Sequence, residues 1–139
     1  MYVFILKDKD KDKDKDKNEE KLRDFRKYDI WIDAMQLVQD VYDLVDGFPA
    51  NEKFVLSSQI TRSAISIPSN IAEGASRVSE KDFARFLEIA LGSSFELETQ
   101  LRIASKRNYF DSSEFESLFK KIVSLQRRIY ALRKNILNS

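Results

Sequence analysis

The segment that decides the fold is residues 59–77, which reads QITRSAISIPSNIAEGASR. Its apolar side chains recur at steps of three and four, the period of a helix with one buried face. The pattern predicts a helix that Asn51 caps. Pro68 removes one backbone hydrogen bond, so a kink is expected near Ser66. The expected buried stripe consists of Leu56, Ile60, Ala64, Ile67, Ile71 and Ala75.

The same period predicts two further helices after this segment. Ser79 is suited to cap the first, with Glu80 and Asp82 in the first turn, where the helix dipole favours negative charge. Asp111 or Ser112 is expected to open the second, whose apolar steps allow coiled-coil packing. The expected stripes are Phe83, Phe86 or Leu87, Ala90, Leu97, Leu101 and Ala104 in the first, and Phe115, Leu118, Ile122, Leu125, Ile129, Leu132 and Ile136 in the second.

A fourth helix is expected ahead of this segment, from about residue 22 to residue 46. We expect this helix to end at Gly47 and Pro49, because glycine commonly ends a helix and proline cannot continue one. Its expected buried stripe consists of Phe25, Tyr28, Trp31 or Ile32, Met35, Val38, Tyr42 and Val45.

Helices of this length joined by short loops pack as antiparallel neighbours. The sequence therefore predicts an all-α, up-down-up-down four-helix bundle over residues 22–139. A chain of 139 residues suits one domain, and with 3 glycines and 2 prolines it lacks the turn residues that a β-sandwich or barrel needs. Residues 1–21, in which lysine and aspartate alternate from residue 7 to residue 17, are predicted to form a disordered low-complexity tail.

The chain contains no cysteine and no histidine. It therefore lacks a thiolate nucleophile, the commonest general base and the commonest zinc ligand. We predict that the protein is not an enzyme and binds no cofactor or metal. No apolar run approaches the roughly 20 residues that span a bilayer, so we expect a cytoplasmic protein without a membrane segment.

Polar residues follow the edge of two of the predicted apolar stripes. If the two polar lines face each other, Glu73 or Glu96 needs Arg62, Arg77 or Asn70 as a partner, because a buried lone charge is unfavourable. The lines are interpreted as a structural network that fixes helix register, or as a contact with another subunit or a ligand. The residues are Gln59, Arg62 or Ser63, Ser66, Asn70, Glu73 and Arg77 in one line, and Gly92, Ser93, Glu96 and Gln100 in the other.

Charge is distributed unevenly although the net charge is only +1. All the charged side chains after residue 117 are basic, and several recur every seven positions on one side of the last helix. Such a stripe can hold phosphates, and it is also an ordinary solvated face that complements the dipole of a helix C-terminus. The RNA-binding candidates are Lys120, Lys121, Arg127, Arg128 and Lys134.

Residues 59–74, which include a proline inside a helix and then Asn-Ile-Ala-Glu-Gly, resemble a signature of the 23S rRNA intervening-sequence proteins, or four-helix bundle protein family. Residues 86–98, which read FLEIALGSSFELE, are similar to a second signature. Trp31 with Ala34, and Phe48 with Pro49, resemble the family's opening helix and first turn. The resemblance covers residues 25–137, and it departs from the family at Ser63, where alanine is usual, and in the Lys/Asp tail.

This resemblance implies a bacterial protein encoded in, or related to those encoded in, insertions of large-subunit rRNA genes. It implies a homo-oligomer, a ring of five subunits. Similar accessory proteins of diversity-generating retroelements bind RNA and a reverse transcriptase. The positions that match the family signatures are Arg62, Asn70, Glu73, Arg77, Ser93 and Glu96.

Two hypotheses about function follow. In the first, a non-enzymatic homo-oligomer binds structured RNA through the basic residues of its last helix. In the second, the protein is a scaffold or accessory subunit that binds a protein partner without touching nucleic acid. The sequence names neither the RNA nor the protein partner.

Overall fold

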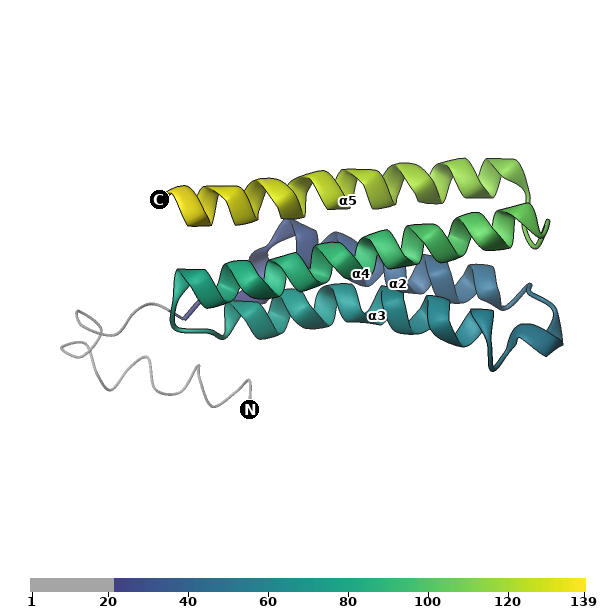
Figure 1. The fold of residues 1–139 in the computed structure, drawn as a ribbon, viewed down its shortest axis with the longest axis horizontal. Helices are drawn as coiled ribbons and strands as arrows, with labels where there is room; N and C mark the ends of the chain where they lie inside the picture. Colours follow the sequence, from purple (N-terminus) through teal and green to yellow (C-terminus); the bar gives the residue numbers. More distant parts are fainter. Residues whose placement is uncertain (1–21) are drawn as a thin grey trace.

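The computed structural model describes residues 22–139, which form four α-helices lying side by side: α2 (Asp29–Val45), α3 (Leu56–Ala75), α4 (Glu80–Lys106) and α5 (Ser112–Asn138) (Figure 1). Two short 3-10 helices, η2 (Phe25–Lys27) and η3 (Ala50–Glu52), precede α2 and α3. Contacts join α2 to α3, α3 to α4, α4 to α5, and α5 back to α2. The all-α antiparallel bundle is confirmed. The predicted disordered tail lies outside the described residues.

The chain reverses direction at each connection. The α2–α3 and α4–α5 connections lie at one end of the bundle, whereas the α3–α4 connection and the C-terminus lie at the other (Figure 1). At the first of these ends Tyr109 donates a hydrogen bond from its hydroxyl to Glu52 Oε2 at 2.9 Å, and its ring lies 5.3 Å from that of Phe48. In the part of the chain that the structure describes, no helix is both long and apolar enough to cross a bilayer.

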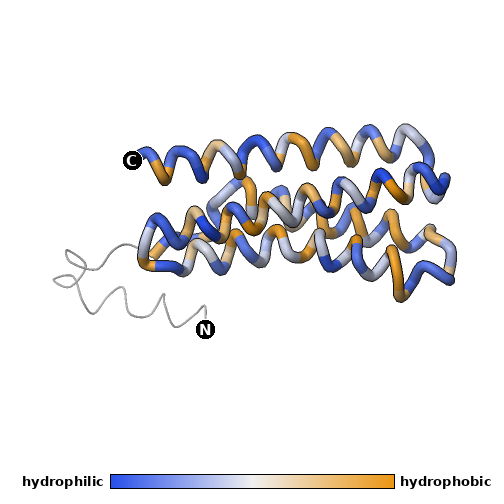
Figure 2. The backbone as a smooth tube through the Cα atoms, viewed as in Figure 1, coloured by the Kyte–Doolittle hydropathy of each residue, from blue (hydrophilic) through white to orange (hydrophobic). Residues whose placement is uncertain are grey.

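The core lies between the helices, and each helix alternates hydrophobic and hydrophilic positions along its length (Figure 2). The predicted stripes of α3, α4 and α5 are confirmed except at Phe115, which is half-buried and packs against Phe110 and Phe119 rather than in the core. Ile60, Ile67 and Ile71 are fully buried in α3, as are Leu87 in α4 and Ile129 in α5. The residues at the ends of the stripes are partly buried against the same core: Leu56, Leu132 and Ile136.

The prediction for the first helix was wrong at its start. The α-helix begins at Asp29 rather than near residue 22, because Tyr28 is extended with φ −75° and ψ 126°. Asp24 instead caps the short helix η2 by accepting a hydrogen bond from the Arg26 backbone N–H at 3.1 Å. Hydrogen bonding from the Arg26 side chain lowers the pKa of Asp24 below its ordinary value. The Phe25 ring packs edge-on against Trp31, with centroids 5.2 Å apart.

The buried face of α2 also differs from the predicted one. Met35 and Tyr42 are each 42% exposed, although both belonged to the predicted stripe. Val38 is buried as predicted, and Phe25, Tyr28, Trp31 and Val45 are partly buried against the core. The helix is apolar on two faces, and the prediction was wrong for Met35 and Tyr42. Asp33 and Asp40 lie on the side of α2 that faces α5, where both carboxylates reach cations. The face that enters the core consists of Ile30, Ala34, Leu37, Val38 and Val41.

The helix α3 begins at Leu56, so the prediction that Asn51 caps it was wrong. Asn51 lies within η3, and the residue before α3, Val55, makes no side-chain cap. Pro68 lies inside a helix that is assigned without interruption, and the kink near Ser66 stays a prediction. The amide of Asn70 donates to the Ser66 carbonyl oxygen at 2.8 Å, which adds a side-chain bond in the turn around the proline.

The predicted caps of α4 and α5 are confirmed. Ser79 Oγ accepts a hydrogen bond from the Asp82 N–H at 3.0 Å. Asp111, and not Ser112, caps α5 by accepting one from the Glu114 N–H at 2.9 Å. This bond, with a second from Ser113 Oγ, holds the pKa of Asp111 below its ordinary value, because both stabilise the carboxylate.

The helices α3 and α4 pack closely near Gly74. A Cβ atom added to this glycine would lie 2.5 Å from Phe86 Cβ and 3.1 Å from a ring carbon of Phe83. Phe86 Cβ is fixed by the backbone of α4 and cannot move aside. The helix pair therefore requires glycine at this position.

We expect Gly74→Ala to lower the free energy of unfolding by about 1–3 kcal/mol, because the added methyl group overpacks the interface. The matched control is Gly92→Ala, since a Cβ atom added at Gly92 would meet no other atom within 4 Å. Removing this second helical glycine should raise stability by about 0.5–1 kcal/mol. Chemical denaturation measures both values, and equal effects at the two positions would contradict the packing argument.

Candidate nucleic-acid interface

The five basic candidates lie on α5 in two adjacent rows. Lys120, Arg127 and Lys134 recur every seven residues and share one outer row. Lys121 and Arg128 follow them by one residue, which turns their side chains by about 100° around the helix. The second row faces α2.

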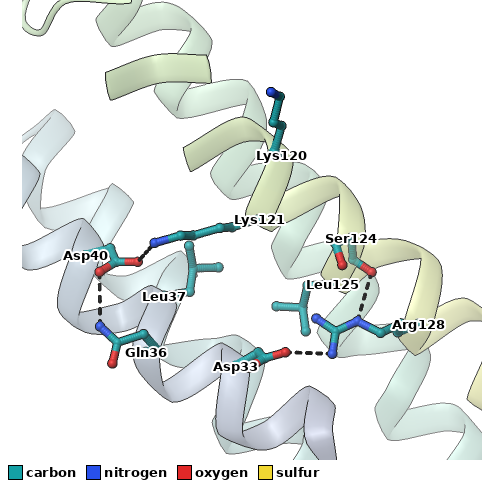
Figure 3. Close-up of a pocket in the computed structure, with 9 residues that line it drawn as sticks. All are labelled: Asp33, Gln36, Leu37, Asp40, Lys120, Lys121, Ser124, Leu125 and Arg128. Atoms are coloured by element: carbon teal, nitrogen blue, oxygen red, sulfur yellow. Dashed lines mark hydrogen bonds and ion pairs between the residues drawn. The ribbon is translucent and has the colours of Figure 1, made fainter. Parts of the chain in front are cut away.

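Ion pairs across the groove between α2 and α5 engage the second row (Figure 3). Lys121 Nζ lies 2.7 Å from Asp40 Oδ2, and Arg128 Nη1 lies 2.7 Å from Asp33 Oδ2. The groove encloses about 370 Å³, with Leu37 among the residues that line it. These two cations therefore join α2 to α5, and each is paired with an aspartate across the groove.

The outer row is not engaged in this way. The side chains of Lys120, Arg127 and Lys134 are exposed and form no hydrogen bond or ion pair with any other residue of the described chain. Lys120 borders the groove, but its side chain points away from both aspartates (Figure 3). We refer to these three residues as the basic stripe.

Tyr130 lies between Arg127 and Lys134 on the same side of α5 and is 53% exposed. Sequence reasoning did not single it out. Its steps of three from Arg127 and four to Lys134 are a signal that places it on the stripe. An exposed ring between cations offers a flat apolar surface beside positive charge.

The two polar lines on α3 and α4 do face each other. Ser66 Oγ and Ser93 Oγ are 2.8 Å apart, and Ser63 Oγ donates to Glu96 Oε1 at 3.0 Å. Gln100 Nε2 donates to the same carboxylate oxygen at 3.2 Å. Glu96 thus finds its partners in a serine and a glutamine rather than in Arg62, Arg77 or Asn70.

Asn70 Nδ2 donates to Ser66 Oγ at 2.9 Å and so belongs to this network, whereas the remaining members of the α3 line lie outside it. Glu73 Oε1 and Arg77 Nη2 form an exposed ion pair of 3.2 Å within one turn of the helix. The side chains of Gln59 and Arg62 are exposed and make no polar contact with another described residue. Within residues 22–139 no group of three or more acidic side chains is placed to hold a metal ion.

These features define a class of protein: an all-α four-helix bundle with ion pairs between neighbouring helices and an exposed row of basic side chains on α5. The chain belongs to the 23S rRNA-intervening sequence protein family, whose model matches residues 26–131. A protein of unknown function from the S23 ribosomal protein family of Bacteroides thetaiotaomicron has a similar crystal structure, with a TM-score of 0.71 and 26% sequence identity. The similarity covers 76% of this chain and 98% of that one. No curated protein matches the chain.

A double-mutant cycle tests whether Lys121 acts within the bundle. We expect Lys121→Met and Asp40→Asn to be coupled by about 0.2–1 kcal/mol in unfolding free energy, the usual range for a partly exposed ion pair. The coupling should decrease as salt is added. The same cycle between Lys120→Met and Asp40→Asn should give no coupling, and an equal value there would contradict the division into two rows.

Proposed function

We propose that this protein is a cytoplasmic, non-enzymatic RNA-binding protein that associates with copies of itself, and that the basic stripe holds RNA phosphates. The observation that carries the proposal is the set of three exposed cations, Lys120, Arg127 and Lys134, which have no partner among the described residues. The family's description, which refers to intervening sequences of 23S rRNA, makes RNA the natural class of ligand.

The spacing of the stripe suits an extended anionic ligand. Seven residues of helix correspond to about 10.5 Å, so the three cations extend over roughly 20 Å of α5. Three phosphate contacts give modest, salt-sensitive affinity, and the contacts multiply when several subunits hold one RNA. Self-association is therefore part of the proposal, while the ring of five that the family resemblance implies stays a prediction.

Tyr130 offers a surface for a base, which phosphate contacts alone do not bind. Proteins hold unpaired bases by stacking them on aromatic side chains, and this contact tolerates any base. A ring that is 53% exposed between Arg127 and Lys134 is placed to stack a base while the cations hold the flanking phosphates. The proposed ligand is thus RNA with single-stranded positions, such as a loop or bulge.

The chemistry of the chain supports the non-enzymatic part of the proposal. The full sequence offers neither cysteine nor histidine. Glu96, the carboxylate held in the α3–α4 network, is bonded to Ser63 and Gln100, which position it and supply neither a strong base nor a nucleophile.

The second candidate function, a protein scaffold, is favoured by the outer face of α2. Ile32 is 49% exposed, and Met35 and Tyr42 are each 42% exposed. Apolar side chains gathered outside the core commonly mark a protein contact. A purified protein that retains no RNA, but retains a protein partner that Met35→Lys releases, would favour this function over the first.

Charge reversal of the stripe tests RNA binding. The variant Lys120→Glu/Arg127→Glu/Lys134→Glu should bind a labelled RNA hairpin at least about tenfold more weakly in fluorescence anisotropy at low salt. The slope of log affinity against log salt should fall by about 0.7 for each phosphate that the variant fails to neutralise, or roughly two in total.

The matched control reverses three exposed lysines elsewhere, Lys27, Lys53 and Lys81, and changes the net charge equally. This control should keep most of the affinity. Equal decreases in affinity for the two triple variants would mean that total charge, rather than the stripe, controls RNA binding. Circular dichroism verifies that both variants keep their helices.

Tyr130→Ala should weaken binding to a hairpin with an unpaired loop by about 1–3 kcal/mol, because no ring remains for a base to stack on. The salt dependence should stay unchanged, since no phosphate contact is removed. Tyr130→Phe, which keeps the ring, should bind as the unaltered protein does. Equal weakening by both substitutions would exclude stacking as the role of this residue.

A further inference from the structure

The groove between α2 and α5 borders the basic stripe, because Lys120 belongs to both (Figure 3). It encloses about 370 Å³, which lies within the range of about 300–1,000 Å³ that small-molecule sites occupy. A single nucleobase fits in a space of this size. The groove is therefore a place where a base of a bound RNA could lie.

The bottom of the groove is apolar and its walls are polar. Leu37 of α2 and Leu125 of α5 close the bottom and are exposed by only 2% and 1%. Asp33 stands on the wall that α2 supplies, and Ser124 and Arg128 stand on the wall that α5 supplies (Figure 3). Ligand sites commonly combine an apolar lining with a few polar groups that fix the orientation of the ligand.

The two ion pairs in the groove differ in the atoms that they leave free. Both oxygens of Asp40 are engaged, Oδ1 by the amide of Gln36 at 3.1 Å and Oδ2 by Lys121 at 2.7 Å. Asp33 uses only Oδ2, which lies 2.7 Å from Arg128 Nη1. No described residue donates a hydrogen bond to Asp33 Oδ1, and this side chain is 53% exposed. The free carboxylate oxygen of the groove therefore belongs to Asp33.

Arg128 also keeps a free donor. Its Nε donates to the Ser124 carbonyl oxygen at 3.3 Å, and its Nη1 lies beside Asp33. Its Nη2 makes no bond with another residue of the described chain. A guanidinium donor thus stands next to a carboxylate acceptor, and the bond to the backbone of α5 holds the guanidinium in place.

A carboxylate beside an arginine matches the hydrogen-bonding edge of one nucleobase. Guanine carries two neighbouring donors, N1–H and the N2 amino group, next to the acceptor O6. A carboxylate accepts from both donors with its two oxygens, and an arginine beside it donates to O6. Adenine, cytosine and uracil each carry only one donor group on this edge. The pair of side chains therefore favours guanine over the other three bases.

We infer that the groove between α2 and α5 binds an unpaired guanine of the RNA that the basic stripe holds. Asp33 accepts from N1–H and the N2 amino group, Arg128 donates to O6, and the ring lies over Leu37 and Leu125. This inference rests on the proposed function and adds a base preference to it.

The charges of the groove explain why a base, and not a phosphate, is its occupant. A phosphate that entered would meet the carboxylates of Asp33 and Asp40 beside the cations. A neutral base with donor groups meets acceptors there instead. Phosphate contacts position a nucleic acid and base edges carry its sequence, so the stripe and the groove divide these two tasks.

The position of the groove relative to the stripe suits one continuous strand. Each residue turns an α-helix by about 100°, so Arg128 lies about 100° to one side of Arg127 and Tyr130 lies about 60° to the other. The basic stripe therefore runs between the groove and the exposed tyrosine ring. A strand held on the stripe can place one base on Tyr130, which stacks any base, and another in the groove, which distinguishes guanine.

Inosine tests the inference because it is guanosine without the N2 amino group. The full-length chain is titrated into labelled hairpins with one stem and a uracil loop that contains a single guanine, inosine or adenine. Fluorescence anisotropy should show the guanine hairpin binding about tenfold more tightly than the inosine hairpin, since one hydrogen bond to a carboxylate is lost. The adenine hairpin should bind no more tightly than the inosine hairpin.

Two matched variants locate the preference within the groove. Asp33→Asn should remove the preference for guanine over inosine, because an amide cannot accept from both donors. Asp40→Asn changes the charge of the same groove equally and should keep the preference, since both oxygens of Asp40 are engaged within the chain. Both variants keep the basic stripe, and the ratio of two affinities is unaffected by a general change in affinity for RNA.

Backbone amide signals in nuclear magnetic resonance show where the base lies. The sequence of α2 contains no basic residue, so phosphate contacts alone should move its signals little. Binding of the guanine hairpin should shift the signals of residues 33–37, and the inosine and adenine hairpins should shift them less.

Equal affinities for the guanine and inosine hairpins would overturn the inference and leave RNA binding by the stripe intact. A guanine preference that survives Asp33→Asn, or that Asp40→Asn also removes, would contradict recognition by Asp33. If the unaltered protein binds none of the hairpins, the proposed function fails and the inference fails with it.

Discussion

The close approach of α3 and α4 is the constraint on which the rest of the structure depends. Gly74 leaves no room for a methyl group against Phe86, and the hydroxyl groups of Ser66 and Ser93 meet at 2.8 Å. Small side chains on both helices let the backbones come together, and the hydrogen bonds fix how far one slides along the other. The remaining two helices pack on this pair, α2 against α3 and α5 against α4.

The sequence predicts α3, α4 and α5 well because each of these helices is apolar on one face only. Ser79 and Asp111 mark the starts of two of them by capping chemistry that acts locally. The first helix was harder, since α2 carries apolar side chains on two faces and Met35 belongs to the one that stays outside. Which face turns inward depends on how α2 packs against α3 and α5, and the periodicity of one helix carries no such information.

The same limit applies to the candidate site. Spacing placed Lys120, Arg127 and Lys134 on one row of α5 and added Lys121 and Arg128 beside them. The second row forms ion pairs because the packing of α2 brings Asp33 and Asp40 next to it. The spacing of residues on α5 could not predict this. The facing of the polar lines was predictable from helical spacing, whereas the partners of Glu96 depended on the exact axial offset of α3 and α4.

The groove between α2 and α5 has a consequence for how the molecule opens. Among the contacts between the four α-helices, this one joins the elements that lie farthest apart along the described chain, with Lys121 and Asp40 separated by 81 residues. Exposed ion pairs there contribute about 0–1 kcal/mol each, far less than a buried apolar seam. We expect local opening of the bundle to begin between α2 and α5. Amide protons of these two helices should then exchange with solvent while those of the α3–α4 pair remain protected.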